Sequence, residues 1–301
     1  MSSNEKISAI IEIGPYMIFF LGAFLFIVIT TIYSKLKNAS DKQFKKRSYG
    51  YKNNKKIDFE NIMPFREIPC NKDIYYASVI PYLNNMEYNN DNIIGAMLLK
   101  FQNEKKITIE KDLIKIISMD NCENNSEEKL LEIMRKATMH GDSLLPKDLK
   151  AYCENNYQEF DSFIKGIRNE ELYKLKKAGH IYERKDSTEC SQKNVLDDKI
   201  YEDTIKLLGL EKFLNEFSLM DEKEIKEIVL WDEYLIFAYL FGIADKVSSK
   251  LNQMNTKDSV DVAKSLSSID NIDMKNLMLA LQTVTAFSQV FASFLSATTK
   301  D

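Results

Sequence analysis

The residue types that most often carry chemistry in proteins are sparse in this 301-residue sequence. The two histidines are His140 and His180, and the four cysteines are Cys70, Cys122, Cys153 and Cys190. The cysteines form no CxxC pair, and no spacing of cysteine and histidine matches a zinc site. The sequence therefore predicts no metal ligands, but it leaves open a His–Cys or Ser–His pair that forms only in three dimensions.

Phosphate-binding loops need closely spaced glycines, because the backbone must approach the phosphate. The nine glycines of this chain are all at least eight residues apart, so no GxGxxG or Walker loop is present. The HExxH and GxSxG patterns are absent as well. The adjacent carboxylates Asp232 and Glu233 are more typical of a helix N-terminus or an exposed face than of an acid–base pair. We therefore predict no enzyme activity, no catalytic, metal-binding or cofactor-binding residue, and no cofactor.

One uncharged segment near the start departs from a globular pattern. Residues 13–34, IGPYMIFFLGAFLFIVITTIYS, contain no charged residue. As a helix this segment is about 33 Å long, which is enough to cross the apolar part of a bilayer. A secretory signal is the alternative, but its apolar region is usually shorter and follows positive charge. We expect a transmembrane helix over 13–34, with residues 1–12 as a short outward-facing N-terminus.

Basic residues crowd the segment that follows this span: Lys35, Lys37, Lys42, Lys45, Lys46, Arg47, Lys52, Lys55 and Lys56. The positive-inside rule places such a cluster in the cytoplasm. The predicted location is therefore the cell membrane, with a single span, the N-terminus outside and the body in the cytoplasm. The residues from Lys35 to Arg47 are also candidates for contact with anionic lipid. Residues 35–58 show no apolar period, which predicts a basic, flexible tether.

Two units of similar outline follow the tether. In the first, residues 59–120, apolar spacing predicts helices around Ile74–Leu83 and over 92–102, and then two strands in ITI and LIKII. In the second, residues 121–184, an amphipathic helix over 126–137 precedes a helix with Pro146 in its first turn. A longer helix is expected from about residue 157 to 178, with Gly179 as its stop and a strand after it. Helices followed by a β-hairpin are the outline of a winged-helix unit.

A helical subdomain is predicted over 198–254, after a polar loop over 184–198. Within it, the uncharged run from Tyr234 to Ala244 is about 17 Å long as a helix and is too short to cross a bilayer. Apolar residues lie on nearly every side of the expected helix 224–251, which indicates burial. The candidate structural residues are Trp231, Tyr234, Leu235, Phe241 and Gly242, and Gly242 is expected to permit close approach of a neighbouring helix.

The final segment, residues 270–299, is predicted to form an amphipathic helix. From Asn276 to Thr299 it is uncharged. Its polar residues Gln282, Thr285 and Gln289 recur at helical spacing, opposite a row of Leu, Val and Phe. Interfacial membrane helices usually carry Lys or Arg on the polar face, and this helix carries neither. We expect residues 276–299 to dock on the body, on a second copy, or on an unknown protein partner.

The pattern that starts at Trp231, VLWDEYLIFAYLFGIADKVSSKL, resembles the YciQ-like predicted membrane proteins, a family defined by a domain of unknown function. REIPCNKD, ASVIPYL and GLEKFLNEFS add to the resemblance, which covers roughly residues 65–255. The resemblance implies a membrane protein and supplies no catalytic residue. The predicted fold is thus mainly α with short β-hairpins: one N-terminal transmembrane helix, two winged-helix-like units and a C-terminal helical subdomain.

The predicted function is that of a membrane-anchored cytosolic interaction or assembly protein. It would contact the lipid bilayer through 13–34 and a protein through 276–299. A membrane-tethered winged-helix regulator that binds DNA is one alternative, and an unrecognised enzyme is another. The formal net charge is −4, and the predicted helix 92–102 carries only one basic residue, Lys100. Because phosphate contacts dominate DNA affinity, we do not expect nucleic acid as a partner.

Overall fold

The computed structural model describes residues 49–86, 92–138, 141–184, 193–216, 231–249 and 274–298. The predicted span over 13–34, the short N-terminus 1–12 and the candidate lipid contacts from Lys35 to Arg47 lie outside these ranges. None of the helices in the described ranges is long and apolar enough to cross a membrane.

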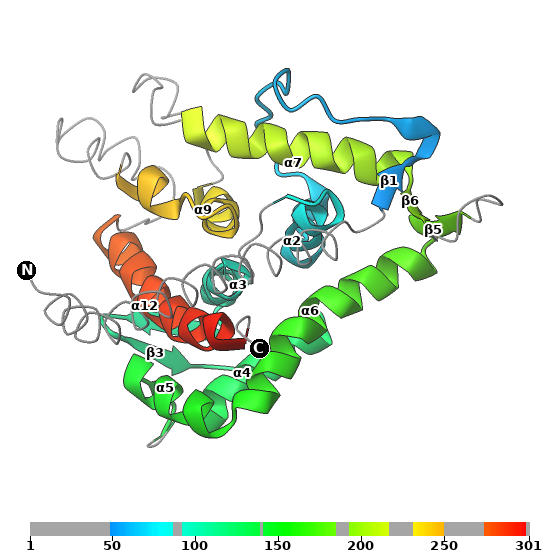
Figure 1. The fold of residues 1–301 in the computed structure, drawn as a ribbon. Coiled ribbons are helices and arrows are strands. Elements are labelled where there is room, and N and C mark those ends of the chain that lie inside the picture. Colours follow the sequence, from blue (N-terminus) through cyan, green and yellow to red (C-terminus); the bar gives the residue numbers. More distant parts are fainter. Residues whose placement is uncertain are drawn as a thin grey trace, which may run out of the picture. The chain divides into compact units, whose positions relative to one another are not determined.

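The described part is mainly helical (Figure 1). The helices are α2 (Ile74–Leu83), α3 (Asn92–Asn103), α4 (Asn125–Ala137), α5 (Pro146–Asn155), α6 (Tyr157–Lys177), α7 (Asp198–Glu216), α9 (Trp231–Leu240) and α12 (Met274–Thr298). The strands are β1 (Tyr49–Tyr51), β2 (Ile107–Glu110), β3 (Leu113–Ile116), β4 (Ser143–Leu144), β5 (Ile181–Arg184) and β6 (Lys193–Leu196). Two short 3-10 turns, Lys52–Asn54 and Cys70–Lys72, also lie in the described ranges.

Helices α4 to α6 begin and end where local chemistry predicts. The side chain of Asn124 accepts a hydrogen bond from the backbone N–H of Glu127, which caps α4. Pro146 lies in the first turn of α5, where its missing N–H costs no hydrogen bond. Gly179 has a φ of +79° just after α6, a conformation that glycine adopts without a Cβ clash. The predicted helix over 126–137, the helix with Pro146 in its first turn and the stop at Gly179 are confirmed, whereas the Asn124 cap was not predicted.

One sheet joins the two predicted units. β2 and β3 form the expected antiparallel hairpin, with Ile109 opposite Ile114. β4 then pairs with β3, so the sheet order is β2-β3-β4. The elements α4, β4, α5, α6, β5 and β6 follow one another in the order of a winged helix. Their first strand, β4, pairs however with β3, which belongs to the hairpin of the first predicted unit. The two winged-helix-like units, and the division of the chain at residue 120, stay predictions.

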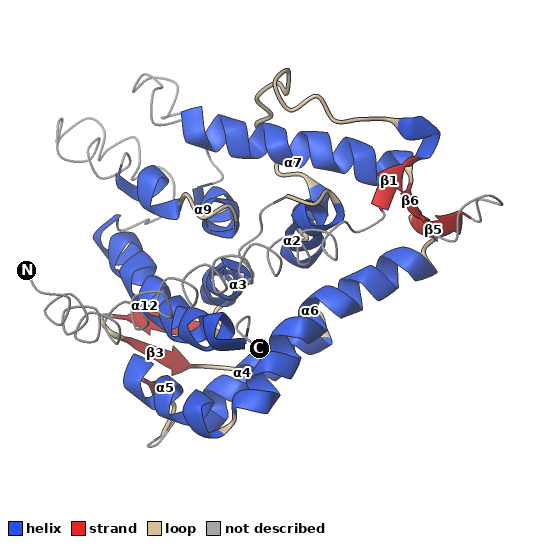
Figure 2. Cartoon of the chain, in the orientation of Figure 1, coloured by secondary structure: helices blue, strands red, loops and turns tan. Residues whose placement is uncertain are grey.

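The other sheet has the order β1-β6-β5 and lies apart from the first (Figure 2). β1 is parallel to β6. Two predictions are therefore wrong in part: the loop over 184–198 contains strand β6, and the tether over 35–58 contains strand β1. The reason is burial. Val195 and Leu196 are both buried, and Tyr51 packs edge-on against Tyr201, 5.1 Å between ring centroids, so both segments gain apolar contacts by pairing.

Helix α3 lies at the centre of the helical part, in contact with α2, α9, α12 and β2 (Figure 1). Its side chains are buried from Ile93 to Leu99 and again at Phe101. Burial on all sides requires close helix neighbours, and Gly95 permits the close approach of α9. A Cβ added to Gly95 would lie 1.9 Å from Cε1 of Tyr239 on α9. The α3–α9 contact therefore depends on a residue without a side chain.

Helix α12 docks on the body of its own chain. It contacts α3, α5 and β2, and its buried side includes Leu281, Val284 and Phe287. Phe291 stacks on Phe160 of α6, with 4.7 Å between ring centroids. The hydroxyl of Thr283 donates a hydrogen bond of 3.0 Å to the carbonyl of Glu110 at the end of β2. The amphipathic helix is thus present, and its apolar side covers the central helix and sheet.

Candidate functional site

The predicted structural residues of helix α9 do not share one role. Tyr234 and Leu235 are buried. Phe241 is only half-buried, at the edge of the core, so its predicted place inside is correct only in part. The side chain of Trp231 lies outside the described residues. Among the described aromatic side chains of this helix, Phe237 is the most deeply buried, and its position was not predicted from the sequence.

Gly242 has a role that differs from the predicted one. The expected helix 224–251 is interrupted: α9 ends at Leu240, and residues 244–249 are helical again. Gly242 is exposed and has a φ of +74°. The N–H of Ile243 donates to the carbonyl of Ala238 across this turn, at 2.9 Å, which is the bond pattern of a glycine helix stop. Gly242 ends α9, and Gly95 is the glycine that permits close helix approach.

Helix α9 fixes the segment that precedes α2. The hydroxyl of Tyr234 donates a hydrogen bond of 2.5 Å to the carbonyl of Arg66. Glu233 forms an ion pair with Lys72, 2.5 Å between Oε1 and Nζ. Lys72 ends a turn in which Cys70, Asn71 and Lys72 all have positive φ, and such residues are costly without fixed surroundings. Glu233 and Tyr234 of the pattern therefore act as a brace for residues 66–72.

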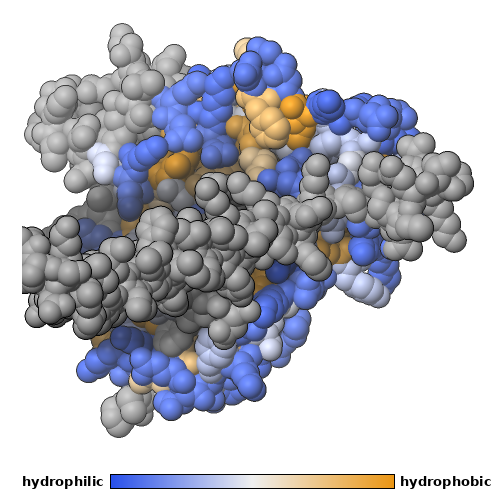
Figure 3. Space-filling model, viewed as in Figure 1, coloured by the Kyte–Doolittle hydropathy of each residue, from blue (hydrophilic) through white to orange (hydrophobic). Residues whose placement is uncertain are grey.

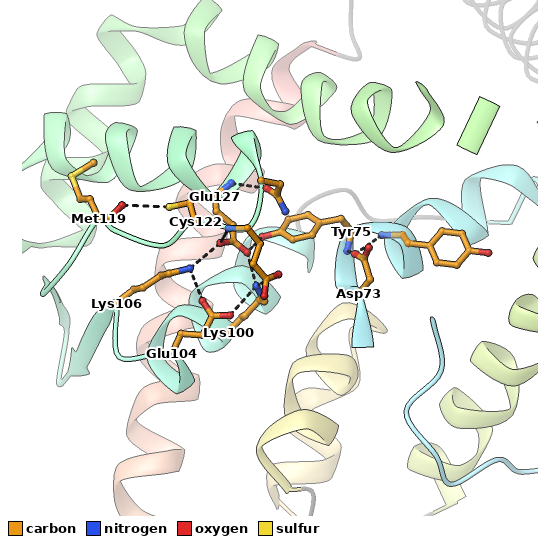
Figure 4. Close-up of polar contacts among 11 residues, drawn as sticks. Asp73, Tyr75, Lys100, Glu104, Lys106, Met119, Cys122 and Glu127 are labelled. Atoms are coloured by element: carbon orange, nitrogen blue, oxygen red, sulfur yellow. Dashed lines mark hydrogen bonds and ion pairs between the residues drawn. The ribbon is translucent and has the colours of Figure 1, made fainter. Parts of the chain in front are cut away.

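A second polar arrangement centres on Glu127, whose side chain has no solvent exposure. Its Oε1 accepts hydrogen bonds from the hydroxyl of Tyr75 at 2.9 Å and from Nζ of Lys100 at 2.5 Å. Its Oε2 accepts from Nζ of Lys106 at 2.9 Å and from the backbone N–H of Glu123 at 3.0 Å. Figure 4 shows these groups converging from α2, α3, α4 and the segment before β2. One carboxylate thus joins four parts of the chain.

The charges in this cluster compensate one another. Burial by itself would raise the pKa of Glu127, but the hydrogen bonds from Lys100, Glu123 and Lys106 lower it to about 2. Burial by itself would lower the pKa of Lys100, but its contacts with three carboxylates raise it above its ordinary value. Both groups are therefore charged at neutral pH, as a buried ion pair must be to stay favourable.

The same carboxylates could in principle hold a cation. One oxygen each of Glu104, Glu123 and Glu127 lies within 4.8 Å of the others. Nζ of Lys100 contacts all three, at 2.8, 2.7 and 2.5 Å respectively. An ammonium group thus occupies the position from which a metal ion would neutralise these carboxylates. A polar cavity of about 430 Å³ lies beside the cluster, and Lys106 lines it together with Glu104 and Glu123. The arrangement favours a structural role over metal binding.

Comparison with known proteins identifies one part of the chain. Residues 195–251 match the family model described as the C-terminal domain of a predicted membrane protein, DUF2207. The resemblance to the YciQ-like, DUF2207 family is confirmed over this range. The description of the family supports a membrane location. No curated protein and no solved structure matched the chain.

The DUF2207 segment, residues 195–251, is joined to the rest of the described chain by polar contacts along its length. Lys55 forms an ion pair with Asp198 at the start of α7. The hydroxyl of Tyr76 donates to Asp203 at 2.9 Å. Nδ2 of Asn92 donates to the carbonyl of Leu240 at the end of α9, at 3.1 Å. In the described part, this segment therefore packs as one side of a common core.

The thiols and the imidazole do not form a nucleophile among the described residues. Burial raises the pKa of Cys153 to about 12, and it raises the pKa values of Cys70 and Cys122 as well. These thiols are therefore protonated at neutral pH and are weak nucleophiles. Nδ1 of His180 lies 2.7 Å from Oδ2 of Asp197. Asp197 also accepts from the N–H of Ile200 in α7, so this pair fixes β5 to the DUF2207 segment. His140 and Cys190 lie outside the described residues.

Proposed function

We propose that this chain is a membrane-anchored protein whose cytosolic body binds a protein, either a partner or a second copy of itself, through the exposed side of α12. The anchor is the predicted helix 13–34, with the N-terminus outside. The family description, which is that of a predicted membrane protein, supports the membrane part of the proposal. The composition of α12 supports the protein-binding part.

The observation that carries the proposal is the absence of charge on the exposed side of α12. Gln282, Gln289 and Ser293 are exposed on it, and Thr285 and Val290 are half-buried between them. From Asn276 to Thr299 the chain carries no charged residue, whereas 29% of the whole sequence is charged. The centres of protein–protein interfaces are depleted of charged residues in the same way. The apolar side of α12 is occupied by the body, so the neutral polar side is the surface left for a partner.

The alternative of DNA binding has less support in the described residues. Helix α6 would be the recognition helix of the second winged-helix-like unit. Lys165 pairs with Asp161, and Lys174 pairs with Glu170 and Glu171. The guanidinium of Arg168 lies over the ring of Tyr82, 4.7 Å from its centroid. These three cations are engaged within the protein, which weakens the case for phosphate contact.

Insertion of a charge tests the proposal. In the full-length chain in native membranes, Gln289→Lys places an ammonium group at the proposed interface. Desolvating an unpaired charge costs several kcal/mol, and about 1.4 kcal/mol is a tenfold change in affinity. We expect the cross-linked complex seen with the unmodified chain to fall at least about tenfold.

Gln158→Lys is the matched control, because Gln158 is an exposed glutamine on another helix, α6. This variant should cross-link like the unmodified chain, and both variants should keep its melting temperature. The proposal is wrong if the unmodified chain yields no protein complex, or if the complex survives Gln289→Lys unchanged.

A further inference from the structure

Residues 58–65 form a turn at 58–61 followed by an irregular stretch, and this segment is fixed against helix α7. The N–H of Phe65 donates to the carbonyl of Gly209 at 3.0 Å, and Nζ of Lys212 donates to the carbonyl of Ile62 at 2.9 Å. Gly209 has no side chain in the way: an added Cβ would lie 2.7 Å from the carbonyl oxygen of Met63. The segment is thus held by its backbone, which decides which side chains face outward.

Two large apolar side chains of this segment point away from the core. Phe59 is 56% exposed and Met63 is 77% exposed, while Ile62 between them is buried. A shallow cavity of about 300 Å³ lies between the segment and α7, lined by Pro64, Phe65 and Ile205 among others. Figure 3 shows apolar surface in the region of α7, surrounded by hydrophilic surface. Single exposed apolar residues are ordinary, but here two of them share a fixed segment with an apolar-lined cavity.

The position of this segment in the chain indicates what covers it. Residues 35–48 separate the predicted membrane helix from strand β1. A flexible chain of that length spans roughly 20 Å between its ends. The 3-10 turn Lys52–Asn54 follows β1 directly, and Lys52 and Lys56 are exposed a few residues before Phe59 in the sequence. In the sequence, the segment 58–65 therefore follows the predicted membrane helix after only a short stretch of chain.

We propose that the surface formed by Phe59 and Met63 lies on the bilayer, with both side chains inserted at the level of the lipid head groups. The flanking cations Lys52 and Lys56 then face anionic head groups, which attract basic residues near the surface. The acidic residues Asp58 and Glu60 lie in the same segment and are repelled by anionic head groups. The apolar side chains of Phe59 and Met63 therefore supply the contact with the membrane, and the two lysines orient it. This inference rests on the proposed membrane anchor, and it fixes which side of the body faces the membrane.

Photo-cross-linking in native membranes tests the inference on the full-length chain. A benzophenone amino acid replaces Phe59 in one variant and Tyr173 in the other. Tyr173, on α6, is the matched control because it is also an aromatic residue and is 65% exposed. On illumination, the variant at position 59 should gain the mass of one phospholipid, and the variant at position 173 should not. Adducts with protein only, or equal lipid adducts at both positions, would overturn the inference.

Carbonate extraction of the same membranes separates this inference from the proposed anchor. A chain that stays in the membrane but gives no lipid adduct at position 59 refutes the docking surface alone. A chain that carbonate releases refutes the anchor, and with it the docking surface that depends on the anchor.

Discussion

The buried carboxylate of Glu127 permits a quantitative prediction for the substitution Glu127→Gln. In the folded chain its pKa is about 2, against an ordinary value of 4.5. At about 1.4 kcal/mol per pH unit, this difference corresponds to about 3 kcal/mol of stability at neutral pH. Removing one partner of a buried ion pair typically costs about 3–5 kcal/mol, which agrees in size. We therefore expect Glu127→Gln to lower the free energy of unfolding by about 3 kcal/mol at pH 7.

The dependence on pH follows from the direction of the shift. Because the folded pKa is lower than the unfolded one, the contribution is fully present well above pH 4.5 and is lost as the pH falls from 4.5 towards 2. The difference between the unmodified chain and Glu127→Gln should therefore shrink to about half its neutral value near pH 3. Urea unfolding of the detergent-solubilised full-length chain, followed by circular dichroism at several pH values, measures this difference.

The neighbouring substitution Glu128→Gln serves as the control. Glu128 is exposed, and its change should leave the free energy of unfolding nearly unaltered at every pH. The reasoning is refuted if Glu127→Gln costs no more than Glu128→Gln at pH 7. It is also refuted if the cost of Glu127→Gln does not diminish on acidification, because the loss would then come from packing and not from charge.

Two further predictions concern the contact between α3 and α9 and the brace that α9 provides. Gly95→Ala should lower the free energy of unfolding by about 1–3 kcal/mol because its Cβ would overlap the buried ring of Tyr239. At Gly166 on α6 a Cβ would meet nothing within 4 Å, so Gly166→Ala should instead raise the free energy of unfolding by about 0.5–1 kcal/mol. If Gly95→Ala and Gly166→Ala change the free energy of unfolding equally in urea, the proposed role of Gly95 is contradicted. Tyr234→Phe should lower the free energy of unfolding by about 1 kcal/mol in the same assay, because the carbonyl of Arg66 loses its hydrogen-bond donor. The control Tyr173→Phe, at an exposed position, should change it by nearly nothing. If Tyr234→Phe costs no more than the control, the Tyr234 hydroxyl does not contribute to the brace.

Helix termini and the hairpin were predictable because their causes are local. Asn124 caps α4, Pro146 begins α5 and Gly179 follows α6, and each acts on backbone groups within a few residues. The pairing of β2 with β3 is likewise a short-range hairpin. The apolar row of the last helix was also readable, since spacing at 3.6 residues per turn sets which side is buried. The charge and hydropathy of residues 13–47 predict an anchor and its orientation in the same direct way.

Other features are decided by residues that are far apart in the sequence. Strand β6 pairs with its neighbour β5 and also with the distant β1, which offers further hydrogen bonds and tyrosine packing to a polar stretch. Glu127 looks like one more acidic residue at a helix start until Tyr75, Lys100 and Lys106 converge on it. Helix α9 is apolar on most sides, so periodicity could not show whether Phe237 or Phe241 faces inward. Likewise, spacing does not distinguish a glycine that ends a helix, Gly242, from one that admits a neighbouring ring, Gly95. Sequence alone predicts most of the helices, the β2–β3 hairpin and a membrane segment for this protein. The tertiary structure decided which charges, rings and glycines meet, because those contacts depend on distances that only the folded chain sets.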